Sequence, residues 1–383
     1  MGLEISNVNE INFIDDIDEI EKEYVNKFGL PVFNISDWNS TKEFQSEMIK
    51  LLTDEIQIND VDYIFSYTES DNRVQKLLYK FGFKKTNKSI LLTHSGSASI
   101  FNVINLLKKM GIDNLYVICP GYFTVFHACS IFNINCIPIY IKRTEQFTID
   151  YEEILKTSKK NCAYWVTNPI YCTSVYYSSE DIAFFKTLLK DNIVVFDECL
   201  CFNGKELCRE LEDSKNFIGI YGPHKTVCIN SFKFSMVVCD TIYQNFLDAW
   251  ADVFCGCLNN SCDYAISHFL SNNFDCYLDI FKRNINTKLN YLKQACLNMN
   301  VNFDEKANGY LISMYFPYID AKNGLDLEFI KKILFNTGVR FIPGIRNHFD
   351  ENMGLNFRVN LTTINKSSIN SITNLIEFLN LHS

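Results

Sequence analysis

The feature that most constrains this chain is an alternation of short apolar segments with helical ones between about residue 70 and residue 240. Continuously apolar strands separated by helices are typical of a mostly parallel sheet that is covered on both faces. The expected strands are 115–119, 136–141, 163–167, 193–196, 217–221 and 232–238, and the expected helices are 72–82, 98–110, 123–132, 150–159, 179–190 and 204–212. The sequence therefore predicts an α/β fold with helices on both sides of the sheet.

The pattern changes after Asp240. Apolar residues recur at helical spacing across 274–299, which predicts one long helix. Beyond it we expect strands near 309–316, 339–342 and 356–362 and helices near 326–336 and 366–381. We predict a large α/β domain over residues 61–260 and a small α+β domain over residues 261–383. Residues 1–60 form an N-terminal arm that contributes to the small domain and carries an acidic helix over 9–28.

Charge and composition exclude several classes of protein. A net charge of −9, with no block rich in lysine or arginine, argues against a nucleic-acid partner. No run of 18 apolar residues is present, so we expect no membrane span. The 15 cysteines lack the spacing of metal sites, and the N-terminal residues do not resemble a signal peptide, so we expect reduced thiols, no bound metal and a cytoplasmic protein.

Polar and aromatic residues stand where expected strands end, which is where open α/β sheets bind ligands. Ser95, Gly96 and Ser97 begin a helix, and the free N–H groups and dipole of such a turn suit a phosphate. The same turn is also typical of an ordinary helix cap. Tyr122 follows one strand and is suited to stacking on a planar heterocycle, or to core packing. Asn168 follows another and is suited to donating to a phenolate oxygen, or to a turn before proline.

Charged residues recur at the same edge. Asp197 ends an apolar strand, and such an acid needs a partner, either a protonated pyridine nitrogen or a protein cation. Lys225 follows the strand 217–221 and is a candidate former of a Schiff base, or a solvated loop lysine. His224 and Lys233 lie close to it in sequence and are candidate phosphate contacts. Arg358 lies in an apolar strand, where an arginine usually meets a carboxylate of the protein or of a ligand.

These residues, in this order, resemble the fold type I pyridoxal-phosphate enzymes, specifically the class I/II aminotransferases of the aspartate aminotransferase superfamily. The resemblance runs from about residue 30 to the C-terminus. It implies pyridoxal 5'-phosphate as cofactor and an amino acid and a 2-oxo acid as substrates. It also implies phosphate binding by Ser95, Gly96 and Ser97, ring stacking by Tyr122, a hydrogen bond from Asn168 to the ring oxygen O3′, contact of Asp197 with the pyridine nitrogen, a Schiff base on Lys225, and binding of the substrate carboxylate by Arg358.

The resemblance further implies a homodimer with its active site at the subunit interface. Tyr67 then corresponds to a tyrosine that reaches the phosphate of the neighbouring subunit. Trp38 falls in the N-terminal segment that lines the substrate pocket, although packing explains a tryptophan there equally well. Asn168 also borders the substrate in this reading.

Three positions depart from the family pattern. Leu200 stands where a tyrosine is common, Gly222 where a serine or threonine is common, and Lys233 where an arginine binds phosphate bidentately. These changes leave the cofactor prediction standing and leave the reaction open between transamination and decarboxylation, elimination or cyclisation. A non-catalytic protein with this fold is disfavoured because no DNA-binding module precedes residue 60. A nicotinamide-dependent Rossmann enzyme is disfavoured because the motif G-x-G-x-x-G is missing.

Overall fold

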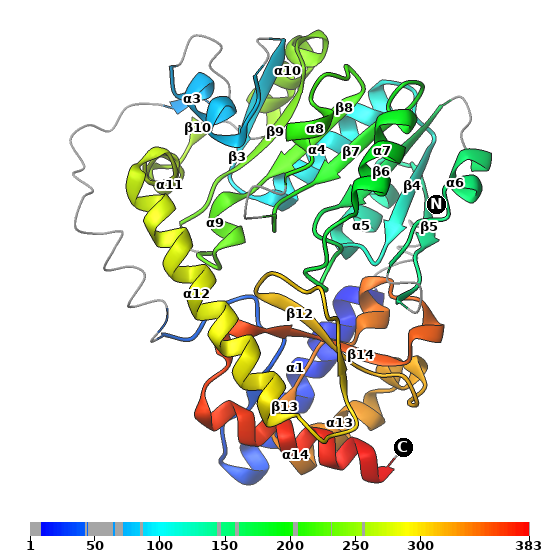
Figure 1. Ribbon diagram of the computed structural model, residues 1–383, viewed down its shortest axis with the longest axis vertical. Coiled ribbons are helices and arrows are strands. Elements are labelled where there is room, and N and C mark those ends of the chain that lie inside the picture. The colour runs from blue at the N-terminus through cyan, green and yellow to red at the C-terminus, as the bar shows by residue number, and fades with distance from the viewer. Residues whose placement is uncertain are drawn as a thin grey trace, which may run out of the picture.

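The computed structural model describes residues 9–42, 44, 64–65, 72–84, 87–143, 147–157, 161–201, 206–230, 232–254 and 257–382. At its centre lies a seven-stranded sheet in the order β3-β9-β8-β7-β6-β4-β5 (Figure 1). The strands are β3 Lys88–Thr93, β4 Asn114–Cys119, β5 Asn135–Tyr140, β6 Cys162–Thr167, β7 Ile193–Asp197, β8 Phe217–Tyr221 and β9 Ser235–Asp240. Strands β4 to β8 run parallel, and β9 is antiparallel to both of its neighbours. The predicted α/β fold with a mostly parallel sheet is confirmed.

Five of the six expected strands lie within one residue of their predicted bounds, and β9 begins and ends a few residues later than predicted. The sequence analysis missed β3. This strand begins with a lysine, which interrupts the apolar pattern, but Lys88 is buried and its amine donates a 2.9 Å hydrogen bond to the carbonyl of Ser214. The sequence pattern did not reveal this strand because the hydrogen-bond partner that allows Lys88 to be buried is distant in sequence.

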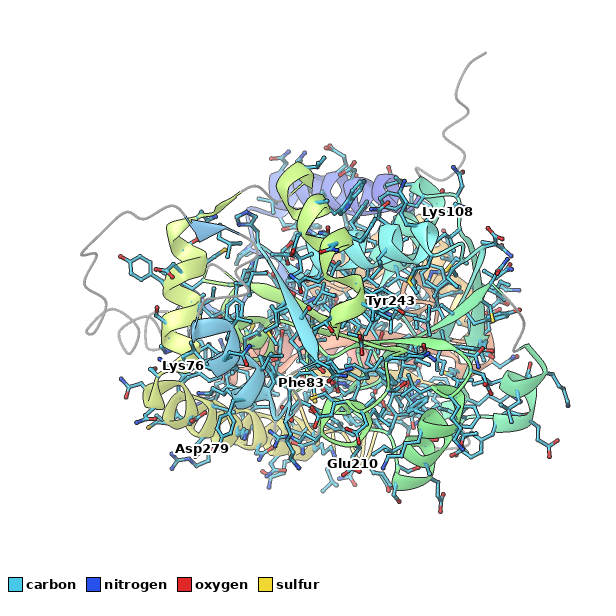
Figure 2. The ribbon with its side chains drawn as sticks, turned by 90° about the horizontal axis from the view of Figure 1, so that it is seen from above. Lys76, Phe83, Lys108, Glu210, Tyr243 and Asp279 are labelled. Atoms are coloured by element: carbon cyan, nitrogen blue, oxygen red, sulfur yellow. The ribbon has the colours of Figure 1, made fainter. Side chains whose placement is uncertain are left out.

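Helices cover both faces of the sheet, as the alternation predicts. One face carries α4 Gly96–Lys109, α5 Phe123–Ile131 and α10 Gln244–Phe254, and the other carries α3 Asn72–Phe81, α7 Ser179–Leu188 and α8 Cys208–Leu211. Seen from above, Lys108 and Glu210 mark the outer sides of these two layers (Figure 2). Helix α6 Tyr151–Thr157 packs through Ile154 into the second layer. Helix α8 is shorter than the expected 204–212, part of which lies outside the described residues.

The C-terminal third of the chain lies below the large sheet and is called the lower layer (Figure 1). Helix α11 Asn260–Leu270 is followed by the long α12 Asn272–Ala295, which runs from the large sheet to this layer. There β11 Asn302–Phe303, β12 Leu311–Phe316 and β14 Leu355–Asn360 form an antiparallel sheet that packs with α13 Leu327–Thr337 and α14 Lys366–His382. None of the described helices combines the length and hydropathy that a membrane span requires.

The N-terminal arm joins this lower layer. Helix α1 Asn9–Phe28 packs on α13, and β1 Phe33–Asn34 pairs in parallel with β13 Val339–Arg340. Another short pair joins β2 Ile64–Phe65 to β10 Cys257–Leu258. The expected helix at 9–28 is thus confirmed, whereas the domain boundaries at residues 60 and 260 remain a prediction.

The order of the strands produces a crevice at one edge of the sheet. The chain leaves β4 to form β5 on one side and then returns to form β6 on the other side of β4. The connections after β4 and β6 therefore diverge, and ligands of open α/β sheets bind at such a point. Tyr122 follows β4 and Asn168 follows β6, so both flank this crevice.

We predict that the aromatic side chains between the large sheet and the helices α7 and α8 contribute much of the stability. Phe196 on β7 is fully buried and stacks on Phe217 with ring centroids 5.2 Å apart. Phe196→Ala should lower the free energy of unfolding by about 3–5 kcal/mol, because it leaves a cavity in a packed core. Urea denaturation measures this change. Tyr79, whose side chain is 83% exposed, is the matched control, and Tyr79→Ala should change stability by less than about 0.5 kcal/mol.

Candidate functional site

A cavity of about 280 Å³ opens at the carboxyl edge of the large sheet. It is formed by the N-terminal arm, the start of α4, the residue after β4 and the segment after β8. Its lining residues are Trp38, Asn39, Ser95, Gly96, Ser97, Tyr122, Gly222, Lys225, Asn230, Lys233 and Phe234. The structure thus brings seven of the predicted site residues together around one space, although they come from four separate parts of the chain.

Lys225 lies in α9 Pro223–Thr226, one short turn that follows β8. Its carbonyl accepts a 2.8 Å hydrogen bond from the Tyr310 hydroxyl, which ties this turn to the lower layer. Its Nζ lies 4.8 Å from the ring centre of Trp38 and 4.9 Å from that of Tyr122. Within the part of the chain that the structure describes, Nζ makes no hydrogen bond or ion pair. The amine therefore faces the cavity between two aromatic rings.

The start of α4 offers the cavity hydrogen-bond donors. The hydroxyl of Ser95 accepts a 3.2 Å bond from the Ala98 N–H and caps the helix, which leaves the first-turn N–H groups of Gly96 and Ser97 for other acceptors. Two glycines at this corner pack beside Cys199. A Cβ atom at Gly96 would lie 3.1 Å from the Sγ of Cys199, and one at Gly222 would lie 3.4 Å from the same atom. Together with the helix dipole and the amine of Lys233, this donor set matches a phosphate group.

Asp197 ends β7 close to this cavity and is 5% exposed. Its Oδ1 accepts a 3.2 Å hydrogen bond from the backbone N–H of Cys199. Burial raises the pKa of its carboxyl group, and the positive charge of Lys225 partly offsets that rise. Among the described residues it has no cation in direct contact. A ligand that presents a protonated nitrogen would supply the partner that a buried carboxylate requires.

Asn168 is held at the neighbouring strand end. Its backbone N–H donates a 2.9 Å bond to the carbonyl of Asp197, and its side-chain Nδ2 donates a 2.7 Å bond to Oε1 of Glu198. The ends of β6 and β7 are thus locked together. The sequence analysis assigned no role to Glu198, although a second acid directly after Asp197 at the end of a buried strand was a signal that could have been followed.

Arg358 lies on β14 and is 2% exposed. Its Cζ lies 3.9 Å from the ring centre of Trp38, while Nε donates a 3.1 Å bond to the carbonyl of Ser36 and Nη2 donates to the same oxygen. No carboxylate of the described chain forms an ion pair with it, so the structural salt bridge considered from the sequence is absent there. The indole of Trp38 contacts both Arg358 and Lys225, which links the two cations.

The structure corrects the expectation for His224. This side chain is fully buried, and its Nε2 lies 3.1 Å from Nδ1 of His268. The ring packs against Phe234 and Phe274 and does not line the cavity, so it is not placed to contact a phosphate there. Consecutive residues on a helical turn point in different directions, and Lys225 takes the direction that faces the cavity. Tyr67, predicted to reach a neighbouring subunit, lies outside the described residues.

Comparison with known proteins identifies the fold. No protein-family model and no curated protein sequence matches the chain. Among solved structures, an aspartate aminotransferase from Thermotoga maritima is similar with a TM-score of 0.77 at 14% identity, covering 95% of this chain and 97% of that one. An alanine aminotransferase from Pyrococcus furiosus gives a TM-score of 0.75 at 16% identity, covering 96% and 97%. The protein therefore has the fold of the aminotransferases.

We predict a measurable pH effect from the buried histidine pair. Burial, together with His268, lowers the pKa of His224 to about 3. An unfolded histidine titrates near pH 6.5, so below that pH the unfolded state binds the extra proton and the free energy of unfolding falls as the pH falls. His224→Gln should therefore lose less stability between pH 7 and pH 5 than the wild type does, by about 2 kcal/mol.

Urea denaturation at both pH values provides the measurement. His382 is exposed at the end of α14, and His382→Gln should keep the wild-type dependence on pH. An identical dependence in His224→Gln and in the wild type would contradict the prediction.

Proposed function

We propose that this protein is a pyridoxal-phosphate-dependent aminotransferase that acts on an α-amino acid and a 2-oxo acid, with Lys225 as the residue that binds the cofactor covalently. The observation that carries the proposal is the amine of Lys225, which faces the cavity between Trp38 and Tyr122 without an ion-pair partner among the described residues. The start of α4 lines the same cavity, and Asp197 lies close to it. The fold shared with aminotransferases supports the same reading.

The residues present fit this cofactor. Ser95, Ser97 and Lys233 would bind its phosphate with the N–H groups at the start of α4, and Tyr122 would cover one face of its ring. Asp197 would hold a proton at the pyridine nitrogen, which meets the need of a buried carboxylate for a cationic partner. When bound, the cofactor supplies an electron sink for the bond that breaks at the substrate Cα.

Each remaining role follows from a side chain of this protein. The Nε and Nη2 of Arg358 donate to the carbonyl of Ser36, and the remaining nitrogen, Nη1, would bind the substrate carboxylate. The amine of Lys225 would take a proton from the substrate Cα and return it elsewhere, as a general base and then a general acid. Trp38 and Tyr122 would exclude water from that amine, which strengthens the electrostatic interactions around it.

The fold relatives leave the reaction itself open. Leu200 is buried and carries no donor at the position where a tyrosine is common in the family. That difference favours a second candidate, a lyase, decarboxylase or cyclase that uses the same cofactor on an amino acid. Our proposal also includes a homodimer whose partner subunit borders the site, and the cytoplasm as its compartment, in keeping with the free thiols of the described cysteines.

The first test concerns the lysine. Incubation with pyridoxal phosphate should give the wild type a visible absorbance band, which Lys225→Ala should lack. The variant should also form 2-oxo acid from amino acids at a rate lower by about 10²–10⁴-fold, because it has lost its general acid and base. Lys186, whose side chain is 51% exposed, gives the control variant Lys186→Ala, which should behave as the wild type. A wild type that gains no band would refute the cofactor assignment.

The second test concerns the arginine. Arg358→Lys keeps a positive charge and loses the fork of donors, so KM for the amino acid should rise about 10–100-fold with a smaller change in kcat. Steady-state kinetics measures both constants. Arg340 lies in β13 and pairs with Asp18 and Glu21, so Arg340→Lys is the matched control and should leave KM unchanged. An unchanged KM in Arg358→Lys would place the substrate carboxylate elsewhere.

The reaction type is read from the products. Transamination should convert an amino acid and a second 2-oxo acid into the exchanged pair, detected by mass spectrometry. Release of carbon dioxide or ammonia without exchange would favour the lyase, decarboxylase or cyclase.

A further inference from the structure

The segment 36–39 of the N-terminal arm is held by side chains that are distant in sequence. Nε of Arg358 donates a 3.1 Å hydrogen bond to the carbonyl of Ser36. Nδ2 of Asn360, on the same strand β14, donates to the carbonyls of the two residues that flank Trp38, at 2.9 Å and 3.3 Å. The backbone on both sides of Trp38 is therefore bound to the lower layer.

The carbonyl of Trp38 itself has a different partner. It accepts a 2.6 Å hydrogen bond from Nδ2 of Asn230, which lies five residues after Lys225 and lines the same cavity. The Sγ of Cys228 lies 3.5 Å from this carbonyl oxygen, and burial raises the pKa of its thiol to about 11, so the thiol remains protonated and donates weakly. The middle of the segment is therefore bound to the part of the chain that follows Lys225, and its two ends are bound to β14.

The position of this carbonyl determines where the indole of Trp38 lies. The ring centre is 3.9 Å from Cζ of Arg358 and 4.8 Å from Nζ of Lys225, and the ring meets Tyr122 edge to face. Of the aromatic side chains, tryptophan attracts a cation most strongly. The indole thus joins a cation of the lower layer to the cation that follows β8, and it forms one wall of the cavity.

Resting on the function proposed above, we propose that Asn230 is a positioning residue, whose amide holds Trp38 against Arg358 and so prepares Arg358 to bind the substrate carboxylate. It acts through the backbone of Trp38 and takes no part in proton transfer. Without this bond the segment would be fixed at its two ends alone, and the indole would be able to leave the guanidinium. Arg358 would then lose part of the packing that orients it, and binding of the carboxylate would have to restore that order.

Two other roles for Asn230 lead to different expectations. Because it lines the cavity, its amide could contact the cofactor or the substrate directly. Its side chain could also serve only to fill space beside the arm. Direct contact does not depend on the indole of Trp38, and space filling does not depend on a hydrogen-bond donor. Variants that remove one of these features at a time therefore separate the three roles.

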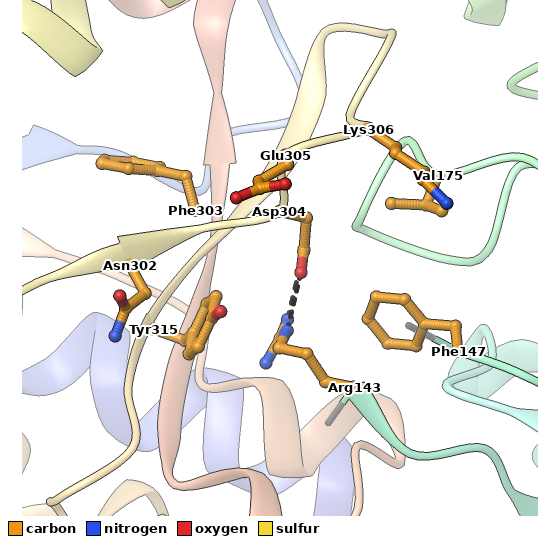
Figure 3. A pocket seen from close by; sticks show the side chains of 9 residues that line it. All are labelled: Arg143, Phe147, Val175, Asn302, Phe303, Asp304, Glu305, Lys306 and Tyr315. Carbon is orange, nitrogen blue, oxygen red and sulfur yellow. Dashed lines mark hydrogen bonds and ion pairs between the residues drawn. The ribbon is translucent and has the colours of Figure 1, made fainter. Parts of the chain in front are cut away.

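A separate contact between the large sheet and the lower layer supplies a control. It lies at a second cavity of about 290 Å³, where Figure 3 shows Arg143 facing Asp304. These side chains are buried and form an ion pair with Nε and Oδ1 2.8 Å apart, and Nη2 of Arg143 donates a 2.8 Å hydrogen bond to the hydroxyl of Ser313. Ser313→Ala therefore weakens a contact between the same two parts of the protein without touching Trp38 or its cavity.

The first measurement uses the protein without cofactor. Of its three tryptophans, Trp165 is fully buried, so Trp250→Phe leaves Trp38 as the one that acrylamide can reach. In this background Asn230→Ala should raise the quenching of fluorescence by acrylamide, because the loss of one hydrogen bond raises the population of the undocked segment about 2–10-fold. Asn230→Leu keeps the shape of the side chain without a donor and should have the same effect. Ser313→Ala should leave the quenching unchanged.

The second measurement is steady-state kinetics of the cofactor-loaded protein. KM for the amino acid should rise about 2–10-fold in Asn230→Ala, which corresponds to one hydrogen bond, while kcat changes less than about twofold because Lys225 is retained. In a Trp38→Ala background the same substitution should add no further rise in KM, because the side chain that Asn230 positions has been removed. Ser313→Ala should leave both constants unchanged.

Four outcomes would overturn the inference. Wild-type quenching in Asn230→Ala would show that the bond does not hold Trp38, and wild-type behaviour of Asn230→Leu would assign the effect to space filling. A rise in KM that persists in the Trp38→Ala background would assign it to direct contact with the ligand. Equal effects in Ser313→Ala would assign them to a general loosening between the large sheet and the lower layer.

The fluorescence measurement also separates this inference from the proposed function. A protein that gains no absorbance band with pyridoxal phosphate would refute the proposed function and, with it, the expected change in KM. Normal turnover with unchanged quenching would refute the role of Asn230 alone. Should Asn230→Ala fail to fold, Asn230→Leu supplies both measurements, and wild-type values in that variant would refute the proposal.

Discussion

Two adjacent buried carboxyl groups lie at the carboxyl edge of the large sheet, and each requires a hydrogen-bond donor or a cation as its partner. This requirement determines the arrangement of the residues around them. Asp197 ends a strand that is packed on both faces and Glu198 follows it directly, and both are buried, so neither can rely on water. Glu198 draws its partners from the protein, through Asn168, Leu207 and Tyr221. Asp197 receives one backbone N–H and the distant charge of Lys225. Glu198, whose hydrogen-bond partners all come from the protein, makes the site rigid. Asp197, which has no cation in direct contact among the described residues, is the acid suited to a cationic ligand.

The alternation of apolar strands and helices made most of the large sheet predictable, because each strand is buried on both faces and so reads as a continuous apolar run. The same logic placed Tyr122, Asp197 and Lys225 at strand ends, and Tyr122 and Lys225 line one cavity there with Asp197 close by. It failed for His224, because proximity in sequence does not specify which way a side chain points from a helical turn. That choice depends on the packing of Phe274, which is distant in sequence.

The contacts of Trp38 were beyond prediction for a different reason. A tryptophan in the N-terminal arm could be assigned to the substrate pocket by resemblance alone. Its stacking on Arg358 requires the arm to lie beside β14, and Ser36 bonds to Arg358 across 322 residues of sequence. No local pattern encodes a pairing of that range. It arises from the parallel pairing of β1 with β13, which fixes the arm against the lower layer.

This pairing has a consequence for the order of events during synthesis. The ribosome makes Trp38 before the strands of the large sheet and Arg358 after them. The large sheet can fold as a unit while the chain is still growing. The wall that Trp38 forms beside Lys225 depends on β13 and β14, so the arm must wait, undocked, until the last strand leaves the exit tunnel. A nascent chain therefore presents an open cleft, and the closed one forms once the arm has docked on β13 and β14.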